Sequence, residues 1–365
     1  MNARKLRSAA HLVAAFALFG FGMAGAPGAR AQTSGQEAES YTVTDADRAA
    51  VVNAKVATPH AMPIRSTEDG QVRAVPGTTL HRNAASASAL VAPTAPTLRY
   101  PADLTYQGGT PLQSTEHHAI YLLPNGHCRI SECWGNPEGF LADLSRSDFI
   151  HITDQYVGAS ANNRYPVGRH AFLGFTPPFN FSTNSHPLTD ADMVAAVHAV
   201  ASKTGNTGHG HLYHVFLPKG TDECFDNTYS VCYSPDNGAT FYFCAYHGYA
   251  DFSDIGHVLY TVEPYQNVPG CDEPPGTPNG QLIDSTNNVL SHETFEAITD
   301  PDLDAWWNNG GNLTEGGSEI GDECAWIGTY GGKVYWNPGY FSVGEKTYAA
   351  QFEYDNAQHA CALAP

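Results

Sequence analysis

The residues best suited to chemistry lie in one short stretch, residues 291–301, with the sequence Ser-His-Glu-Thr-Phe-Glu-Ala-Ile-Thr-Asp-Pro. On a helix, His292 and Glu296 share one face, where an imidazole and a carboxylate can bind a single cation. Glu293 lies about 100° further round the helix and is free to act as a base. This is the metallohydrolase pattern H-E-x-x-H with glutamate in place of the second histidine. It predicts a metal site; for the isolated motif, two polar helix residues satisfied by hydrogen bonds are the alternative.

A hydrolytic metal site needs a third protein ligand and an open position for water. The best source is the acidic segment at residues 318–324, Ser-Glu-Ile-Gly-Asp-Glu-Cys. We expect Glu319 to be the third ligand and Asp322 to hold the other ring nitrogen of the histidine, and the reverse assignment stays open. Asp302, ten residues after His292, ranks third because threonine stands where the chain would need a glycine to turn.

The ligand set His292, Glu296 and Glu319 carries a charge of −2 and would neutralise a divalent ion. Its bound water would therefore keep a pKa above the value of about 7 that neutral ligands produce. One divalent metal is expected, with zinc first and manganese or calcium as alternatives. A hydrolase that is slow or works at alkaline pH fits this ligand set, and so does a site with no catalysis at all.

Further histidines extend the list of candidates. His247 ends an aromatic strand beside a cysteine, where it could donate a hydrogen bond to a transition state or be an ordinary core residue. His209 and His211 would face one side of a strand and suit a metal, whereas His214 would face the other, and surface histidines are the alternative. Four tryptophans near the acidic segment could form the floor of a cleft that binds sugar, or pack in the core. These are Trp306, Trp307, Trp326 and Trp336.

Alternating aromatic and β-branched runs with Gly/Pro turns predict an α/β domain with a mixed sheet. A helix should begin after Thr189 and stop at Gly205, and a second helix, from about Asn287, should carry the metal motif and stop at Asp300 before Pro301. A short helix is expected near residues 44–57. The predicted strands are residues 118–123, 211–217, 240–246, 257–262, 333–336 and 347–354.

The N-terminal third divides into two parts by composition. Residues 1–31 have a basic start, an apolar run and an Ala-Arg-Ala end, which is typical of a cleaved secretory signal peptide. Residues 32–101 are rich in Ala, Thr, Ser and Pro and are expected to be a propeptide or a linker. Residues 102–365 are long enough for one domain. We therefore expect a secreted protein, extracellular or periplasmic, that is not inserted in a membrane after signal cleavage.

Eight cysteines in an exported chain, none of them in a C-x-x-C pair, favour disulfides over a thiolate zinc site. Sequence neighbours suggest the pairs Cys128 with Cys133, Cys224 with Cys232, Cys244 with Cys271, and Cys324 with Cys361. Removal of the signal peptide takes the formal net charge from −19 to −23, because it deletes four basic and no acidic residues. That charge argues against nucleic acid as a partner.

The chain resembles the EXORDIUM and phosphate-induced protein family of secreted plant and bacterial proteins. The likeness runs in order from about residue 104 to 361, nearly the whole predicted domain. It is carried by residues 104–109, 243–247, 278–280, 291–293, 299–301, 305–306, 319–324 and 351–354, with Glu296, Cys271 and Cys361.

The resemblance implies an exported or cell-surface protein, linked in plants to growth and the cell wall, and it joins the His292 helix and the Glu319/Asp322 segment in one site. It brings no established enzymatic activity. We expect a zincin-like, disulfide-stabilised domain that hydrolyses peptide bonds, with Glu293 as general base and an extracellular peptide or cell-wall component as partner. The alternative is a non-catalytic extracellular protein in which the same cluster binds a structural metal and the tryptophans bind carbohydrate or protein.

Overall fold

The computed structural model describes residues 39–64, 103–123, 129–162, 164–175, 187–308, 319–325, 329–330, 333–334 and 339–365. They all belong to one compact unit, Ala38–Pro365. The predicted signal peptide, Trp326 and Trp336 lie outside the described residues. None of the described helices has the length and apolar character needed to cross a membrane.

A mixed eight-stranded sheet forms the centre of the α/β fold, in the order β1-β6-β5-β8-β12-β11-β2, with β3 also paired to β11. The first five of these strands run parallel, and β11 is antiparallel to all its neighbours. The bounds are β1 Glu39–Val43, β2 Lys55–Val56, β3 His60–Pro63, β5 Glu116–Leu122, β6 Ala171–Phe175, β8 His211–Phe216, β11 Phe243–Phe252 and β12 Gly256–Glu263. The strands predicted from residues 118, 211, 240 and 257 are confirmed, although β11 begins three residues later than expected.

Residues 39–64 contribute three strands, β1, β2 and β3, to this sheet, although composition groups them with a propeptide or linker. β1 extends the parallel edge beside β6, and β3 pairs with β11 so that His60 lies opposite His247. Whether the segment predicted as a propeptide is removed stays a prediction. As folded, its first part is built into the domain and brings a histidine to the sheet.

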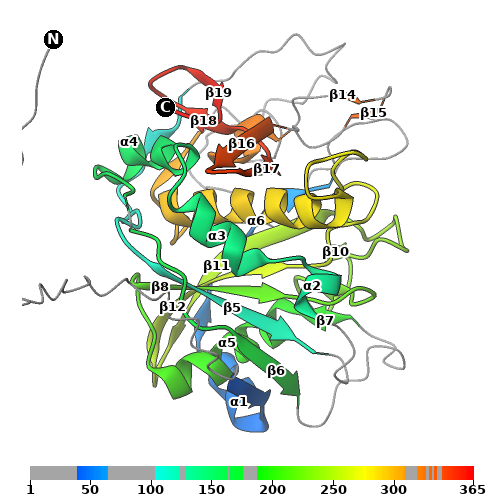
Figure 1. The fold of residues 1–365 in the computed structure, drawn as a ribbon. Helices are drawn as coiled ribbons and strands as arrows, with labels where there is room; N and C mark the ends of the chain where they lie inside the picture. Colours follow the sequence, from blue (N-terminus) through cyan, green and yellow to red (C-terminus); the bar gives the residue numbers. More distant parts are fainter. Residues whose placement is uncertain are drawn as a thin grey trace, which may run out of the picture. The chain divides into compact units, whose positions relative to one another are not determined.

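Helices cover both faces of the sheet (Figure 1). On one face lies α5, Asp190–Thr204, with the short α1, Asp45–Val52, against it; on the other lies α6, Gln281–Thr299. The remaining helices are α2 Ile130–Cys133, α3 Pro137–Leu144, α4 Asp154–Val157 and the 3-10 turns η1 Phe149–Thr153 and η2 Asp322–Cys324. The α5 prediction is confirmed at both ends, because Thr189 forms a capping box with Asp192 and Gly205 closes the helix with φ 74°.

The metal-motif helix α6 is longer than predicted. It begins at Gln281, six residues before Asn287, after Gly280 at φ 90°, and it ends at Asp300 as expected. The start was missed because residues 284–288, which are all polar, are buried. An apolar periodicity, the signal that marks most helices, is absent there.

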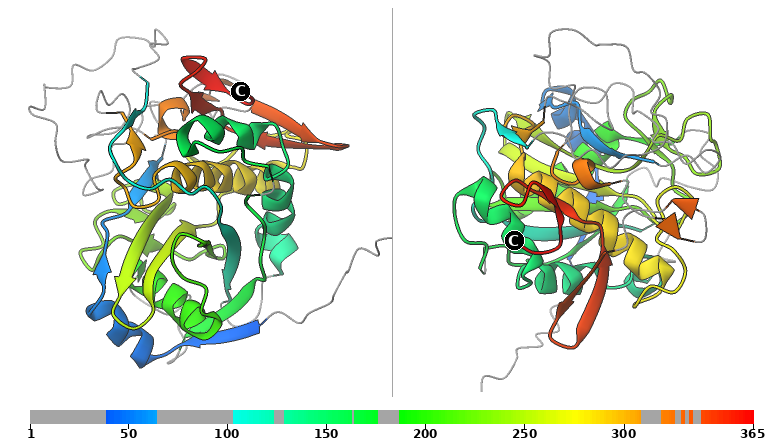
Figure 2. Two further views of the ribbon diagram at one scale, coloured as in Figure 1. Left: turned by 90° about the vertical axis from the view of Figure 1, so that its left-hand side faces the viewer. Right: turned by 90° about the horizontal axis from the view of Figure 1, so that it is seen from above.

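Four short antiparallel pairs and the three-stranded sheet β10-β9-β7, in which β7 and β9 run parallel, complete the described fold. The pair β16–β17 packs on α6 on the side away from the central sheet (Figures 1 and 2). The strands of the four pairs and of the three-stranded sheet are β4 Thr105–Tyr106, β7 Leu188–Thr189, β9 Glu223–Cys224, β10 Cys232–Tyr233, β13 Trp306–Trp307, β14 Thr329–Tyr330, β15 Lys333–Val334, β16 Gly339–Val343, β17 Lys346–Ala350, β18 Glu353–Asp355 and β19 Ala360–Ala362. The strand predicted from residue 347 is thus divided into β17 and β18. Helix α6 lies between two β layers, which explains its burial on all sides.

Three predicted disulfides are confirmed: Cys224–Cys232, Cys244–Cys271 and Cys324–Cys361. Cys133 is also disulfide-bonded, and its predicted partner Cys128 lies outside the described residues. The Cys244 bridge anchors β11 three residues before His247, and the Cys324 bridge ties η2 to β19. Two disulfides therefore fix the segments that carry His247 and Asp322.

Candidate metal centre

The helix α6 brings its motif residues together as their spacing predicts. His292 Nε2 lies 3.1 Å from Glu296 Oε1, one turn further along the helix. Both side chains have no exposed surface, and the same holds for Glu293. The helix stops at Asp300, whose carboxylate accepts a hydrogen bond from the backbone N–H of Ala305 at 2.5 Å. Three ionisable side chains are thus held on one rigid, fully buried turn.

His247, on β11, points at this helix. Its Nδ1 lies 3.3 Å from Glu293 Oε2 and 3.6 Å from Glu296 Oε2, and its Nε2 lies 3.6 Å from Glu319 Oε2. It therefore sits among three carboxylates rather than beside an open cleft. This position suits an ion-binding or charge-compensating role as well as the expected role of hydrogen-bond donor.

The acidic segment that contains Glu319 and Asp322 reaches the same cluster. Asp322 Oδ1 lies 3.9 Å from His292 Nε2, and the backbone N–H of Asp322 donates to Glu296 Oε1 at 3.2 Å. Asp322 is therefore on the Nε2 side of the ring, together with Glu296. The Nδ1 side faces Gly321, where a Cβ would come within 2.5 Å of Nδ1. Asp322 thus lies beside the same ring nitrogen as Glu296, and which of Glu319 and Asp322 binds an ion stays a prediction.

His60 is a member of the cluster that the sequence analysis missed. Its Nε2 lies 2.8 Å from Asp322 Oδ2, its Nδ1 lies 3.6 Å from Glu319 Oε1, and its ring centre is 5.9 Å from that of His247. The register of β3 with β11 places His60 directly opposite His247. The only local signal was the short segment His-Ala-Met-Pro-Ile, and the Ala/Pro-rich composition around it concealed a buried strand.

Burial and mutual repulsion dominate the electrostatics of the cluster. Burial, reinforced by neighbouring carboxylates, raises the pKa of Glu293 and of Glu319 well above the usual range. Burial also raises the pKa of Asp300 to about 7. For His60, burial opposes the charged form, but the Asp322 carboxylate outweighs it and raises the pKa to about 9. Without a cation, the cluster must hold protons to offset its negative charge.

The side chains form two overlapping groups whose ligand atoms lie within 4.8 Å of one another. One contains His60, Glu296 and Asp322, and the other contains His247, Glu293 and Glu296. Among the described residues, Glu293 Oε1, Glu296 Oε2 and Asp322 Oδ1 are buried and accept no hydrogen bond. Buried carboxylate oxygens in this state are costly unless a cation or a proton compensates them. The donor set therefore fits a divalent ion.

A chain of buried polar side chains crosses the neighbouring strands β5, β8 and β12 of the sheet. His117 Nδ1 lies 2.7 Å from His214 Nε2, and His214 Nδ1 lies 2.9 Å from the Thr261 hydroxyl. The hydroxyl in turn donates to Glu263 at 2.8 Å. Burial lowers the pKa of His117 to about 3 and raises that of Glu263 to about 8. The chain is thus built from side chains in their neutral forms.

Other candidate residues lie outside the cluster. Asp302, ranked third as a ligand, instead binds His209 and His257 through its two oxygens, at 2.7 and 2.9 Å. Trp307 is buried, and Trp306 packs its ring 5.3 Å from that of Tyr106. Tyr106 and Trp306 line a pocket of about 850 Å³ together with Gln155 and Arg164.

No family model matches the chain, and searches of curated proteins and of solved structures also found no match. The resemblance to the EXORDIUM family therefore stays a prediction.

Proposed function

We propose that this protein is a secreted, metal-dependent hydrolase with a zincin-like centre, and that it acts on peptide bonds. The observation that carries the proposal is the position of Glu296, whose carboxylate is shared by two groups of buried ligand atoms. One of these groups also contains Glu293, the residue expected to act as a base. Imidazole nitrogens in both groups favour zinc over calcium, which prefers oxygen ligands alone.

His60, Glu296 and Asp322 would hold the ion, with His292 against Glu296 as a further nitrogen donor. Bound there, a divalent ion would polarise a carbonyl group and lower the pKa of a bound water. Glu293 would take the proton from the attacking water, because its carboxylate belongs to the same group of buried ligand atoms as that of Glu296. His247, 3.3 Å from Glu293, orients that carboxylate.

Metal analysis tests the first step of this proposal. The secreted protein is loaded with Zn²⁺, separated from free metal and analysed for bound zinc. We expect Glu296→Gln to retain one equivalent fewer than the wild type. Glu223→Gln is the matched control, because Glu223 is a fully buried carboxyl group that contacts Tyr246 away from the cluster. Equal zinc contents in wild type and Glu296→Gln would reject the metal centre.

A peptide-library digest tests the second step. Glu293→Gln should keep its zinc and lose cleavage by about 100-fold or more, the usual contribution of a general base. Unchanged cleavage by Glu293→Gln would reject its role as base. A zinc-loaded wild type that cleaves nothing would reject the hydrolase and leave the metal centre standing.

The complete burial of the cluster favours a second candidate, a structural metal in an extracellular binding protein. His292, Glu293 and Glu296 have no exposed surface, whereas a catalytic ion needs access for substrate. The binding surface would then be the pocket of Tyr106 and Trp306, since a half-exposed aromatic pair beside Gln155 and Arg164 suits the faces and hydroxyls of a sugar.

Binding to cell-wall oligosaccharides distinguishes this candidate from the hydrolase. Tyr106→Ala should weaken binding by about tenfold or more, because it removes one of two aromatic platforms. Tyr340→Ala is the matched control, since Tyr340 is similarly exposed, at 50% against 54% for Tyr106, and does not line the pocket. Equal binding by the wild type and both variants would exclude this surface.

A further inference from the structure

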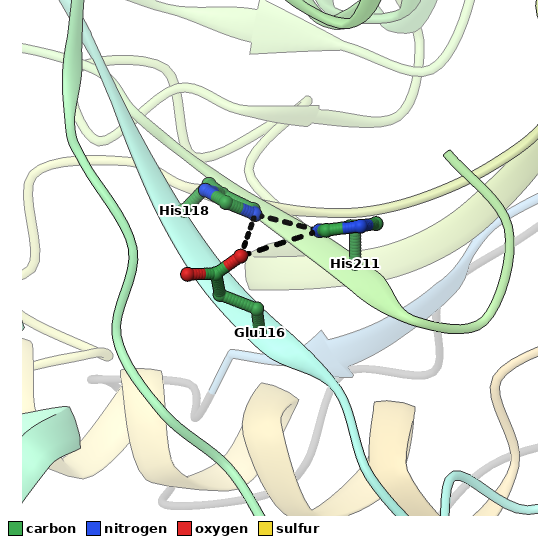
Figure 3. Close-up of side chains that lie close together, drawn as sticks. All are labelled: Glu116, His118 and His211. Carbon is green, nitrogen blue, oxygen red and sulfur yellow. Dashed lines mark hydrogen bonds and ion pairs between the residues drawn. The ribbon is translucent and has the colours of Figure 1, made fainter. Parts of the chain in front are cut away.

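A separate cluster of metal-binding side chains lies on two neighbouring strands of the central sheet (Figure 3). Glu116 and His118, two residues apart on β5, share one face of the sheet, and Glu116 stands directly opposite His211 of β8 in the parallel register. His118 lies opposite Tyr213, with ring centres 5.2 Å apart. The strand pairing alone thus brings two imidazoles and a carboxylate to one place.

The three ligand atoms converge on one point. His118 Nε2 lies 2.9 Å from His211 Nδ1 and 3.5 Å from Glu116 Oε2, and His211 Nδ1 lies 3.6 Å from the same oxygen. Ligand atoms bound tetrahedrally at about 2.0 to 2.1 Å from a zinc ion are about 3.3 Å apart. The three observed separations between ligand atoms, 2.9, 3.5 and 3.6 Å, are close to this value.

Hydrogen bonding accounts for only one side of this triangle. One imidazole can donate to the other at 2.9 Å, but 3.5 and 3.6 Å are too long for either ring to make a good hydrogen bond to Glu116. The triad Asp302, His209 and His257 is different, because each imidazole there contacts its own carboxylate oxygen at 2.7 or 2.9 Å. Both carboxylate contacts in that second triad are at hydrogen-bonding distance, whereas both carboxylate contacts in the Glu116 triad are longer.

The surroundings of His118 fix the ring in a ligating orientation. The backbone of Arg169 accepts a hydrogen bond from the ring. Since Nε2 faces Glu116 and His211, Nδ1 is the nitrogen that donates to Arg169. Gly168 packs so closely that a Cβ there would lie 2.5 Å from Nδ1 and 3.0 Å from Glu116 Oε1. A backbone carbonyl on the outer nitrogen of a histidine is the usual support of a metal ligand, since it presents the lone pair of the inner nitrogen.

We propose that Glu116, His118 and His211 form a second binding site for a divalent transition-metal ion of the zinc class. Two imidazole nitrogens and one carboxylate oxygen are a donor set that zinc accepts. Glu116 and His118 line a pocket of about 390 Å³ next to Val200, Lys203 and Thr204 of α5, so the remaining coordination position is open to water or to an anionic ligand. The adjacent His117 faces the opposite way, toward His214. This site and the α6 cluster therefore occupy opposite faces of the sheet.

Zinc titration of the full secreted chain tests this site independently of the α6 cluster. The protein is stripped with a chelator, titrated with Zn²⁺ in a calorimeter and analysed for bound zinc. Glu116→Gln and His211→Gln should each lose one equivalent, or bind it at least about 100-fold more weakly, because a direct ligand is removed. His170→Gln is the matched control, since His170 lines the same pocket outside the triad. It should bind zinc as the wild type does.

Two comparisons make the result decisive. Glu296→Gln should keep the equivalent that Glu116→Gln loses, so that a failure of the α6 centre and a failure of this site give different zinc counts. Glu116→Gln is nearly isosteric and lies at a partly exposed position, so it should fold. If His211→Gln does not fold, Glu116→Gln alone decides whether the triad binds zinc. Unchanged zinc number and affinity in Glu116→Gln would overturn the proposal.

Discussion

The two long helices on opposite faces of the central sheet are both buried, but by different kinds of side chain. On α5, only two of the ten buried residues are polar, Asp190 and His198. On α6, eleven of the sixteen buried residues are polar. Burying apolar surface stabilises a fold, whereas burying polar and charged groups costs free energy unless they are compensated. The α5 face thus stabilises the domain, and the α6 face uses part of that stability to hold a charged cluster together.

The largest expected effect comes from placing a charge on the apolar face. Val197→Asp on α5 should lower the free energy of unfolding by about 4 kcal/mol, because Val197 packs within the apolar core. Chemical denaturation measures the change. Thr294→Val on α6 is the matched opposite change, and it should cost little or stabilise, because the Thr294 hydroxyl is buried and makes no hydrogen bond among the described residues. Similar losses in both variants would remove the distinction between the two faces.

A pH titration of stability probes the polar face. Burial lowers the pKa of His117 to about 3, while an unfolded histidine has a pKa of about 6.5. Between these values the unfolded chain binds the extra proton, so the contribution of His117 to stability falls as the pH falls. Wild type should lose about 2 kcal/mol from this residue between pH 7.5 and 5.

The difference between the wild type and His117→Asn, measured by denaturation at each pH, isolates this contribution from those of the carboxylates. The difference should shrink or reverse as the pH falls, because asparagine does not titrate. His151→Asn, which removes a more exposed histidine on η1, is the comparison. A constant difference between wild type and His117→Asn over this range would contradict the prediction.

Removing one charge from the cluster should stabilise the metal-free protein. Burial and neighbouring carboxylates raise the pKa of Glu293, so its contribution to stability is lost as the pH rises above the pKa of an unfolded glutamate. Glu293→Gln should therefore raise the unfolding free energy of the stripped protein by roughly 1 to 2 kcal/mol near neutral pH.

Asp143→Asn is the control for this effect. Asp143 is also buried, but it pairs with Arg146 and with Lys346. Neutralising it should destabilise the protein, since its partners lose their counter-charge. If Glu293→Gln also destabilised the stripped protein, the cluster would be internally compensated and would not need a cation.

The smallest expected effect concerns how the two helices begin. Thr189 caps α5 through a capping box, whereas α6 begins at Gly280 without a side-chain cap. Thr189→Ala should cost about 1 kcal/mol, the usual value of such a cap. Thermal unfolding measures it, and an unchanged melting temperature would show that tertiary packing alone fixes the start of α5.

The difference between the apolar buried face of α5 and the polar buried face of α6 also explains which helix bounds the sequence could predict. The bounds of α5 were predictable because caps and a closing glycine are local signals, and the helix carrying His292 was predictable through its motif. The start of α6 was not, because buried polar residues carry no apolar periodicity. The contact of Glu319 and Asp322 with the motif was expected because a metal site needs a third ligand and because the family resemblance joins the two segments. His60 was not found, because it reaches the cluster through strand pairing with His247, which no local pattern records.

The pairing of β3 with β11 would keep the N-terminal segment bound to the domain even if the chain were cut after it. Strand hydrogen bonds to β11 and the contact of His60 with Asp322 tie residues 39–64 to the domain. A protease that cut anywhere between residues 65 and 102 would therefore leave a nicked, two-chain protein rather than release a fragment. The two pieces would migrate together through a sizing column and separate only on denaturation. After such a cut, the histidine that completes the proposed metal centre would belong to a different polypeptide from the other candidate ligands.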